Sequence, residues 1–136
     1  MPSFSETSLQ ELHGCCFDLQ SVLREAIKYQ DFTVLCGYRG KEAQDEAFRT
    51  GNSNVQWPNG RHNSLPSNAV DIAPYPVDWK DVPRFALLAG RIMQIADQMG
   101  ITLRWGGDWD RDTSTVDQNL KDWGHFEVFE PPGVAA

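Results

Sequence analysis

Two long polar stretches limit the folds that this sequence can form. Residues 52–68 and 108–122 are rich in small and polar side chains, and they separate the apolar segments into short pieces. Such spacing leaves few strand–helix–strand units of regular length. A polar stretch as long as the first is uncommon inside a compact domain, and it usually carries function. The sequence therefore predicts short secondary-structure elements arranged around functional loops.

The apolar segments between these stretches predict a mixture of helices and strands. Apolar residues recur at helical spacing over residues 8–29, 41–49 and 83–99. Short apolar or β-rich runs predict strands over residues 32–36, 69–73, 101–105 and 124–129. Gly14 weakens the first helix near its start. We therefore expect the α+β class, with a small and mostly antiparallel sheet flanked by helices.

Composition and charge exclude several classes of partner. The 136 residues carry 12 basic and 19 acidic side chains, a formal net charge of −7. Binding to nucleic acid or to an anionic membrane depends on Lys and Arg, so both partners are disfavoured. No apolar stretch approaches the roughly 20 residues of a membrane helix. We expect one domain over residues 1–136, with residues 131–136 as a flexible tail, and a monomer.

The three cysteines, Cys15, Cys16 and Cys36, indicate no disulfide framework, because their number is odd and two are adjacent. They fit the reduced thiols of a protein made in the cytosol. The absence of a Cys-x-x-Cys pair argues against a cysteine zinc site. The N-terminus has neither a basic region nor an apolar run, so we expect no signal peptide.

The predicted strand 69–73 carries one carboxylate in an otherwise apolar run. In a strand, Asp71 shares a face with the small residues on either side of it, whereas Val70 and Ile72 point to the opposite face and into the core. A carboxylate in such a place costs several kcal/mol unless it is paired or binds a metal. Hydrogen bonding to loop amides and metal ligation are both open interpretations for Asp71.

Histidine is the most informative residue type, because the chain contains only three. His13 lies on the polar side of the first predicted helix and fits a surface or capping role. His62 lies in the first polar stretch and His125 in the last strand, where Gly124 permits a bend that brings Asp122 to the same site. Two imidazoles and a carboxylate are a common ligand set for catalytic zinc, and a further carboxylate can act as base. A core histidine bonded to a carbonyl is the alternative for His125.

In combination, these residues and their neighbours resemble the VanY-like superfamily of zinc peptidases. That superfamily contains D-alanyl-D-alanine carboxypeptidases and L-alanyl-D-glutamate endopeptidases. The chain is most similar to the single-domain endolysins of tailed phages, from about Leu9 to Glu130. The motifs that carry the resemblance are Thr33 to Arg39, Gln44, His62 to Pro74, Arg104 to Trp109 and Gly124 to Glu127.

The resemblance implies a site at the loop–strand junctions. It implies that His62, Asp71 and His125 bind Zn²⁺. It also implies that Asp122 is the catalytic base, and that Arg39 polarises the scissile carbonyl or holds the substrate.

Further side chains are expected to contact the substrate. Gln44 lies in the helix after the first strand motif, and Trp123 follows the expected base. Trp57, Trp105 and Trp109 also lie in or beside the polar stretches. Glu127 shares a face with His125. Two interpretations of Glu127 are open: it supports the expected ligand His125, or it is simply exposed to solvent.

The implied activity is hydrolysis of peptidoglycan stem peptides by an L-alanyl-D-glutamate endopeptidase that acts as a phage or prophage endolysin. The alternatives are a D-Ala-D-Ala carboxypeptidase or dipeptidase, and a non-catalytic wall-binding module with a structural zinc. We expect synthesis in the host cytoplasm, holin-type release and action on the cell wall in the periplasm.

Two features depart from the family pattern. Gly60 stands two residues before His62, where the family often has Ser, and the interval from His62 to Asp71 is longer than in many relatives. We interpret both as variation in substrate handling.

The second polar stretch also resembles the start of an EF-hand calcium loop, because Asp108, Asp110 and Asp112 alternate along it. Thr113 and Asn119 stand where such a loop needs Gly and Glu. A solvated acidic loop is therefore favoured over specific calcium binding.

Overall fold

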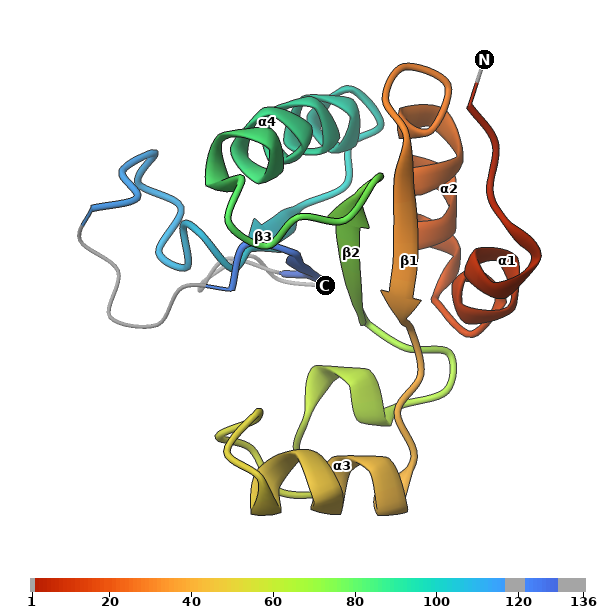
Figure 1. Ribbon diagram of the computed structural model, residues 1–136, viewed down its shortest axis with the longest axis vertical. Coiled ribbons are helices and arrows are strands. Elements are labelled where there is room, and N and C mark those ends of the chain that lie inside the picture. Colours follow the sequence, from red (N-terminus) through yellow and green to blue (C-terminus); the bar gives the residue numbers. More distant parts are fainter. Residues whose placement is uncertain (1, 117–121, 130–136) are drawn as a thin grey trace.

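The computed structural model describes residues 2–116 and 122–129 (Figure 1). Within these ranges, helices and short strands are mixed along the chain, and the expected α+β class is confirmed. The elements are α1 (Glu6–His13), α2 (Phe17–Ala26), β1 (Phe32–Cys36), α3 (Lys41–Arg49), the 3₁₀-helix η1 (Arg61–Asn63), β2 (Ala69–Pro74), α4 (Val82–Gln98), β3 (Leu103–Trp105) and β4 (His125–Val128).

The strands form one sheet in the order β1-β2-β4-β3, and all three pairings are antiparallel. β4, the last of the described strands, thus lies between β2 and β3. In the ladder between β2 and β4, Asp71 pairs with His125. The pairing places two residues that are far apart in sequence next to each other.

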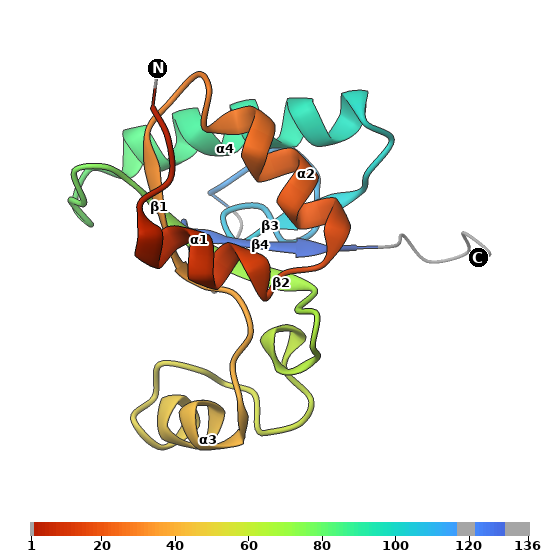
Figure 2. The same ribbon diagram turned by 90° about the vertical axis from the view of Figure 1, so that its right-hand side faces the viewer.

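The core lies between one face of the sheet and two helices. Figure 2 shows α2 and α4 side by side across this face, while α1 packs along β1. Val70 and Ile72 belong to the core together with Phe126 of β4, so the predicted core face of β2 is confirmed. Burial of side chains of this size contributes about 1.5–3 kcal/mol each.

The predicted helix over residues 8–29 is wrong in one respect, because two helices occupy this range. The backbone N–H of Cys16 donates to Ser67 O at 2.8 Å, and the N–H of Ser67 donates to Gly14 O at 2.7 Å. This backbone bridge interrupts the helix directly after the glycine that weakens it. The second helix ends at Ala26, three residues before the predicted boundary.

The remaining boundaries follow local signals closely. The structure confirms residues 32–36 as a strand and residues 41–49 as a helix. The helix α4 begins after Asp81, whose side chain accepts the N–H of Arg84, and Gly100 with a φ of +73° follows its end. β3 is shorter than predicted, and η1 lies within the polar stretch 52–68.

Some expectations concern parts of the chain outside the described ranges. The tail over residues 131–136 and residues 117–121 of the second polar stretch lie there. Among the described helices, none has both the length and the apolar character that crossing a membrane requires.

The segment from α3 to η1 stands apart from the sheet. In both views it lies beyond the end of β1 and before the start of β2 (Figures 1 and 2). The chain enters this segment through Gly37 and returns through the residues that precede Ala69. The candidate site lies where this segment faces the sheet.

Candidate metal centre and active-site cleft

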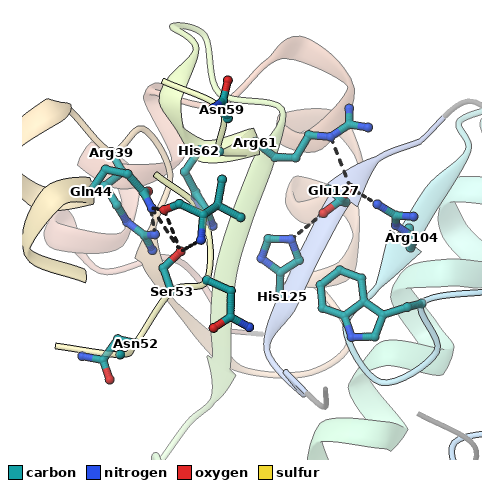
Figure 3. A pocket seen from close by; sticks show the side chains of 15 residues that line it. Arg39, Gln44, Asn52, Ser53, Asn59, Arg61, His62, Arg104, His125 and Glu127 are labelled. Atoms are coloured by element: carbon teal, nitrogen blue, oxygen red, sulfur yellow. Dashed lines mark hydrogen bonds and ion pairs between the residues drawn. The ribbon is translucent and has the colours of Figure 1, made fainter. Parts of the chain in front are cut away.

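A cavity of about 530 Å³ lies between the α3–η1 segment and the sheet (Figure 3). Its lining residues come from both polar stretches of the sequence. They are Arg39, Gln44, residues 51–55 and 59–62, Arg104, Trp109, His125 and Glu127. Residues of the stretch 52–68 thus form one wall of the cavity. Trp109, near the start of the stretch 108–122, forms part of the other wall.

The three predicted metal ligands meet at the carboxylate of Asp71. Its Oδ1 lies 3.3 Å from Nε2 of His62 and 3.0 Å from Nδ1 of His125. The two imidazole rings meet edge to face, with centroids 5.3 Å apart. Both histidines are buried. Two imidazoles and one carboxylate therefore converge from η1, β2 and β4.

Hydrogen bonds at the far side of each ring orient the two imidazoles. Nδ1 of His62 lies 2.7 Å from Gly37 O, and Nε2 of His125 lies 2.8 Å from Glu127 Oε1. Because the carbonyl and the carboxylate are acceptors, these ring nitrogens carry hydrogen, as they do in most metal-ligating histidines. Nε2 of His62 is buried and faces Asp71 Oδ1 at 3.3 Å, but the contact lacks the geometry of a hydrogen bond. A cation between these atoms would satisfy it, so the donor set fits a metal ion.

The carboxylates beside the two imidazoles favour the protonated form of each ring. Burial lowers the pKa of His62, but the neighbouring Asp71 and Cys36 outweigh it and raise this pKa to about 10. In His125, Asp71 and Glu127 outweigh burial and raise the pKa to about 9. Burial raises the pKa of Asp71, but the two imidazoles hold it well below its usual range. A bound metal would take the place of the imidazole protons.

Arg39 and Gln44 form a connected pair in the cleft. Nη2 of Arg39 donates to Asp71 Oδ2 at 3.3 Å, and its Nη1 donates to Gln44 Oε1 at 3.1 Å. Gln44 is 1% exposed, and its amide nitrogen donates to Ser53 Oγ and to Val55 O. Gln44 therefore links the guanidinium of Arg39 to Ser53 and Val55 in the polar stretch 52–68.

A steric constraint explains why Gly60, and not Ser, stands two residues before His62 in this chain. The N–H of Gly60 donates to Asn63 Oδ1 at 2.8 Å, and a Cβ at position 60 would lie 2.6 Å from that oxygen. The Asn63 amide nitrogen in turn donates to Arg39 O and to Gln44 Oε1. The side chain of Asn63 thus occupies the space that a serine side chain at position 60 would need. Asn63 also connects η1 to Arg39.

Asp122 lies on the turn before β4. Its N–H donates to Gly106 O at 2.9 Å, and the N–H of Gly106 donates to His125 O at 2.8 Å. A Cβ at Gly106 would overlap the carbonyl of Asp122. An oxygen of the Asp122 carboxylate lies within 4.8 Å of ligand atoms of Asp71 and His125. Loss of hydration and the negative charge of Asp71 raise the pKa of Asp122.

Glu127 is buried, so the interpretation of simple exposure is wrong. Its carboxylate accepts from Nη2 of Arg104 at 2.8 Å and lies 3.4 Å from Nε of Arg61. Burial raises the pKa of Glu127, but His125 and Arg104 outweigh it and lower this pKa. The sequence pattern alone assigned no role to Arg61 or Arg104. The pairing of Arg104 with Glu127 across β3 and β4 was the signal that could have identified one of them.

Trp109 lines the cavity, whereas Trp105 and Trp123 pack against each other. Trp109 lines the cavity, with its ring 5.3 Å from that of His125 and the guanidinium of Arg104 5.5 Å from its centroid. Trp123 packs against Trp105 at 5.7 Å, and its carbonyl accepts from Nε1 of Trp105. In the described chain, Trp109 rather than Trp123 is among the lining residues.

Outside the cleft, carboxylate oxygens of Asp108, Asp110 and Asp112 lie within 4.8 Å of one another. Asp108 accepts the N–H groups of Asp112 and Thr113. Asn119, the last position of the EF-hand comparison, lies outside the described residues.

Comparisons with known proteins identify the family and the fold of this chain. The family model of phage L-alanyl-D-glutamate peptidases matches residues 2–129. The L-alanyl-D-glutamate peptidase of Escherichia phage T5 is 29% identical over 133 residues, which are 92% of this chain and 96% of the relative. The crystal structure of Serratia marcescens L-Ala D-Glu endopeptidase ChiX has a TM-score of 0.76 at 30% identity, covering 94% of this chain and 91% of that one. This chain therefore belongs to the phage L-alanyl-D-glutamate peptidase family.

Proposed function

We propose that the protein is a zinc-dependent endopeptidase that cleaves the L-alanyl-D-glutamate bond of peptidoglycan stem peptides. As an endolysin, it would act on the cell wall in the periplasm after holin-type release. The observation that carries the proposal is the convergence of His62, Asp71 and His125 beside Asp122, in a cleft of a chain that belongs to this family.

The metal ligands would be Nε2 of His62, a carboxylate oxygen of Asp71 and Nδ1 of His125. Three protein ligands of these types are the set typical of catalytic rather than structural zinc. When bound, zinc supplies an activated water and polarises the substrate carbonyl. The hydrogen bonds to Gly37 O and to Glu127 present these two ring nitrogens to the ion.

Asp122 would act as the general base. In this role, its carboxylate accepts a proton from the attacking water as the water oxygen bonds to the carbonyl carbon. It then delivers that proton to the amine as the carbon–nitrogen bond breaks. Support comes from the position of its carboxylate within 4.8 Å of ligand atoms of Asp71 and His125.

Arg39 would stabilise negative charge on the carbonyl oxygen. Its guanidinium lies at the cleft and is held by Asp71 and Gln44, so it needs little reorganisation during the reaction. Gln44 would contribute to substrate binding by holding in place the side chain of Arg39 and the loop at Val55. Trp109, which lines the cavity beside His125, would provide an aromatic contact to the substrate, whereas Trp123 packs against Trp105.

The cleft also suits an anionic peptide. Arg39, Arg61 and Arg104 line it, although the protein carries a net charge of −7. Positive charge gathered in a cleft favours a negatively charged ligand locally. Stem peptides carry free carboxylates, which is the chemistry that these guanidinium groups recognise.

The test is digestion of purified Gram-negative sacculi, with mass spectrometry of the soluble fragments. We expect peptides that begin at D-glutamate and that disappear when a zinc chelator is added. Release of terminal D-alanine alone would instead indicate a carboxypeptidase. No cleavage by zinc-loaded protein would favour a wall-binding module.

The assignment of the base is tested by Asp122→Asn, which removes the proton acceptor and keeps the shape of the side chain. We expect turnover to fall by roughly 10²–10⁴-fold while the zinc content of the protein stays unchanged. Unaltered turnover in this variant would show that another group is the base.

A further inference from the structure

Two arginines approach a single carboxylate on one wall of the cleft. Nη2 of Arg104 donates to Glu127 Oε2 at 2.8 Å, and Nε of Arg61 lies 3.4 Å from the same oxygen. The other carboxylate oxygen, Oε1, lies 2.8 Å from Nε2 of His125. One negative charge thus faces two guanidinium groups, so this wall has a surplus of positive charge beside His125.

The two guanidinium groups differ in how firmly the protein holds them. The guanidinium carbon of Arg104 lies 5.5 Å from the ring centroid of Trp109 and 4.5 Å from that of Phe129, and its side chain is 26% exposed. The side chain of Arg61 is 49% exposed, and its ion pair with Glu127 is the longer of the two. Arg104 is therefore held in place, whereas the terminal nitrogens of Arg61 are accessible to a ligand.

The third arginine that lines the cavity is already engaged. The guanidinium of Arg39 donates to Asp71 Oδ2 and to Gln44 Oε1, and its side chain is only 19% exposed. Among the lining arginines, Arg61 thus has the most exposed side chain and the weakest contact to its carboxylate partner.

The backbone of Arg61 is fixed although its side chain is exposed. Arg61 is the first residue of η1, and its carbonyl accepts the N–H of Asn68 at 3.3 Å. The next residue, His62, is a proposed metal ligand. Figure 3 shows the side chain of Arg61 extending from η1 toward Glu127, which contacts His125. The guanidinium therefore lies close to the proposed metal centre.

The substrate of the proposed function carries a negative charge next to the bond that is cut. In stem peptides, D-glutamate is joined to the following residue through its γ-carboxyl group, so its α-carboxylate is free. That carboxylate stands on the carbon attached to the scissile nitrogen. Ordinary peptides have a neutral amide at this place. A substrate bound with its scissile carbonyl at the metal centre would therefore bring this charge to the surrounding side chains.

We propose that Arg61 is a specificity-determining residue that binds the free α-carboxylate of D-glutamate through its terminal nitrogens. The proposal rests on the proposed function, and it assigns one substrate group to one side chain. A guanidinium offers a carboxylate two parallel N–H donors and a positive charge, and a neutral carboxamide gains much less from both. Arg104 and His125 would still neutralise Glu127 when Arg61 turns to the substrate.

The test compares two substrates of the zinc-loaded protein. One is an N-acetylated stem tetrapeptide, and the other is the same peptide with the α-carboxyl group of D-glutamate amidated. We expect kcat/KM of the unmodified protein to be about tenfold or more higher for the acid. In Arg61→Gln, this preference should be lost through a slower reaction of the acid alone. The matched control Arg49→Gln should keep it, because Arg49 pairs with Glu46 on α3 and is not a lining residue.

A merely structural role of Arg61 predicts a different pattern. If Arg61 acted only by supporting Glu127, Arg61→Gln would slow the reaction of both peptides equally and would weaken zinc binding through His125. Equal losses on the acid and on the amide would therefore overturn the proposal.

Chemical modification provides a second measurement that needs no variant. Phenylglyoxal modifies accessible arginines, and peptide mass spectrometry reports Arg61 and Arg49 separately. The D-glutamyl product peptide should slow modification of Arg61 about tenfold at saturation, whereas its amidated counterpart and the residue Arg49 should show no such protection. This readout decides the matter if Arg61→Gln fails to fold, and equal modification of Arg61 with and without the acidic product would overturn the proposal.

The failures can be told apart. If the zinc-loaded protein cleaves neither peptide, the proposed function fails, and the role of Arg61 fails with it. If it cleaves both peptides equally well, or if the preference for the acid survives in Arg61→Gln, the role of Arg61 is refuted and the endopeptidase remains.

Discussion

Glu127 remains charged inside the protein because donors surround its carboxylate. His125, Arg104 and Arg61 approach it from β4, β3 and η1. Metal-binding histidines commonly depend on such a partner, which fixes the ring and its hydrogen. Residue types alone could identify His62, Asp71, His125 and Asp122 as candidates, because unusual polar groups flank apolar strands. The arginines could not be identified in that way, since their partner lies on a distant segment.

The first prediction at this scale concerns metal affinity. Replacing Glu127 with Ala removes the acceptor of the His125 Nε2 hydrogen, so we expect zinc affinity to fall about 10–100-fold. Competition with a chromogenic chelator measures this change. Glu25→Gln is the control, since Glu25 lies on α2 and pairs with Lys28. Equal zinc affinity of the two variants would refute a positioning role for Glu127.

The second prediction at this scale concerns thiol reactivity. Burial, followed by the neighbouring thiols and carboxylates, raises the pKa of Cys15 to about 12. The reactive thiolate of Cys15 is therefore scarce until the pH approaches that value. In native protein at pH 8, we expect iodoacetamide to label Cys16 and Cys36 well before Cys15. Labelling of Cys15 at the rate seen in urea-unfolded protein would contradict this.

At the scale of elements, local patterns account for most boundaries but not for the break between α1 and α2. Apolar periodicity continues through Gly14, Cys15 and Cys16, so a single helix is the natural prediction. Backbone hydrogen bonds to Ser67 end it, and these depend on a loop that is distant in sequence. The shift in register of β1 against β2 after Val34 is hidden from the sequence for the same reason.

The turn at Gly106 yields a prediction at this scale. Gly106→Ala would force the backbone of Asp122 away from its present position, so we expect kcat to fall strongly while zinc content changes little. Gly90→Ala is a matched control on α4, where an added Cβ meets nothing within 4 Å. It should raise the free energy of unfolding by roughly 0.5–1 kcal/mol and leave kcat unchanged. Equal kcat in both variants would show that the Gly106 contact does not position the base.

For the whole molecule, the proposed metal centre would join segments that are far apart along the chain. Ligand binding to the folded state alone adds about 2.7 kcal/mol of stability when the ligand is at 100 times its Kd. We therefore expect zinc to raise Tm by several degrees and a chelator to reverse the rise, as measured by calorimetry. The variant His62→Ala should show a smaller rise. An identical Tm with zinc and with chelator would argue against binding at this site.

The position of β4 within the sheet has a consequence for the timing of activity. This strand comes last in the sequence of the sheet, yet it lies between β2 and β3 and carries His125. A chain still emerging from the ribosome holds His62 and Asp71 but lacks the strand that completes both the sheet and the cluster. By the proposed mechanism, activity therefore cannot precede the synthesis and pairing of β4, which supplies His125.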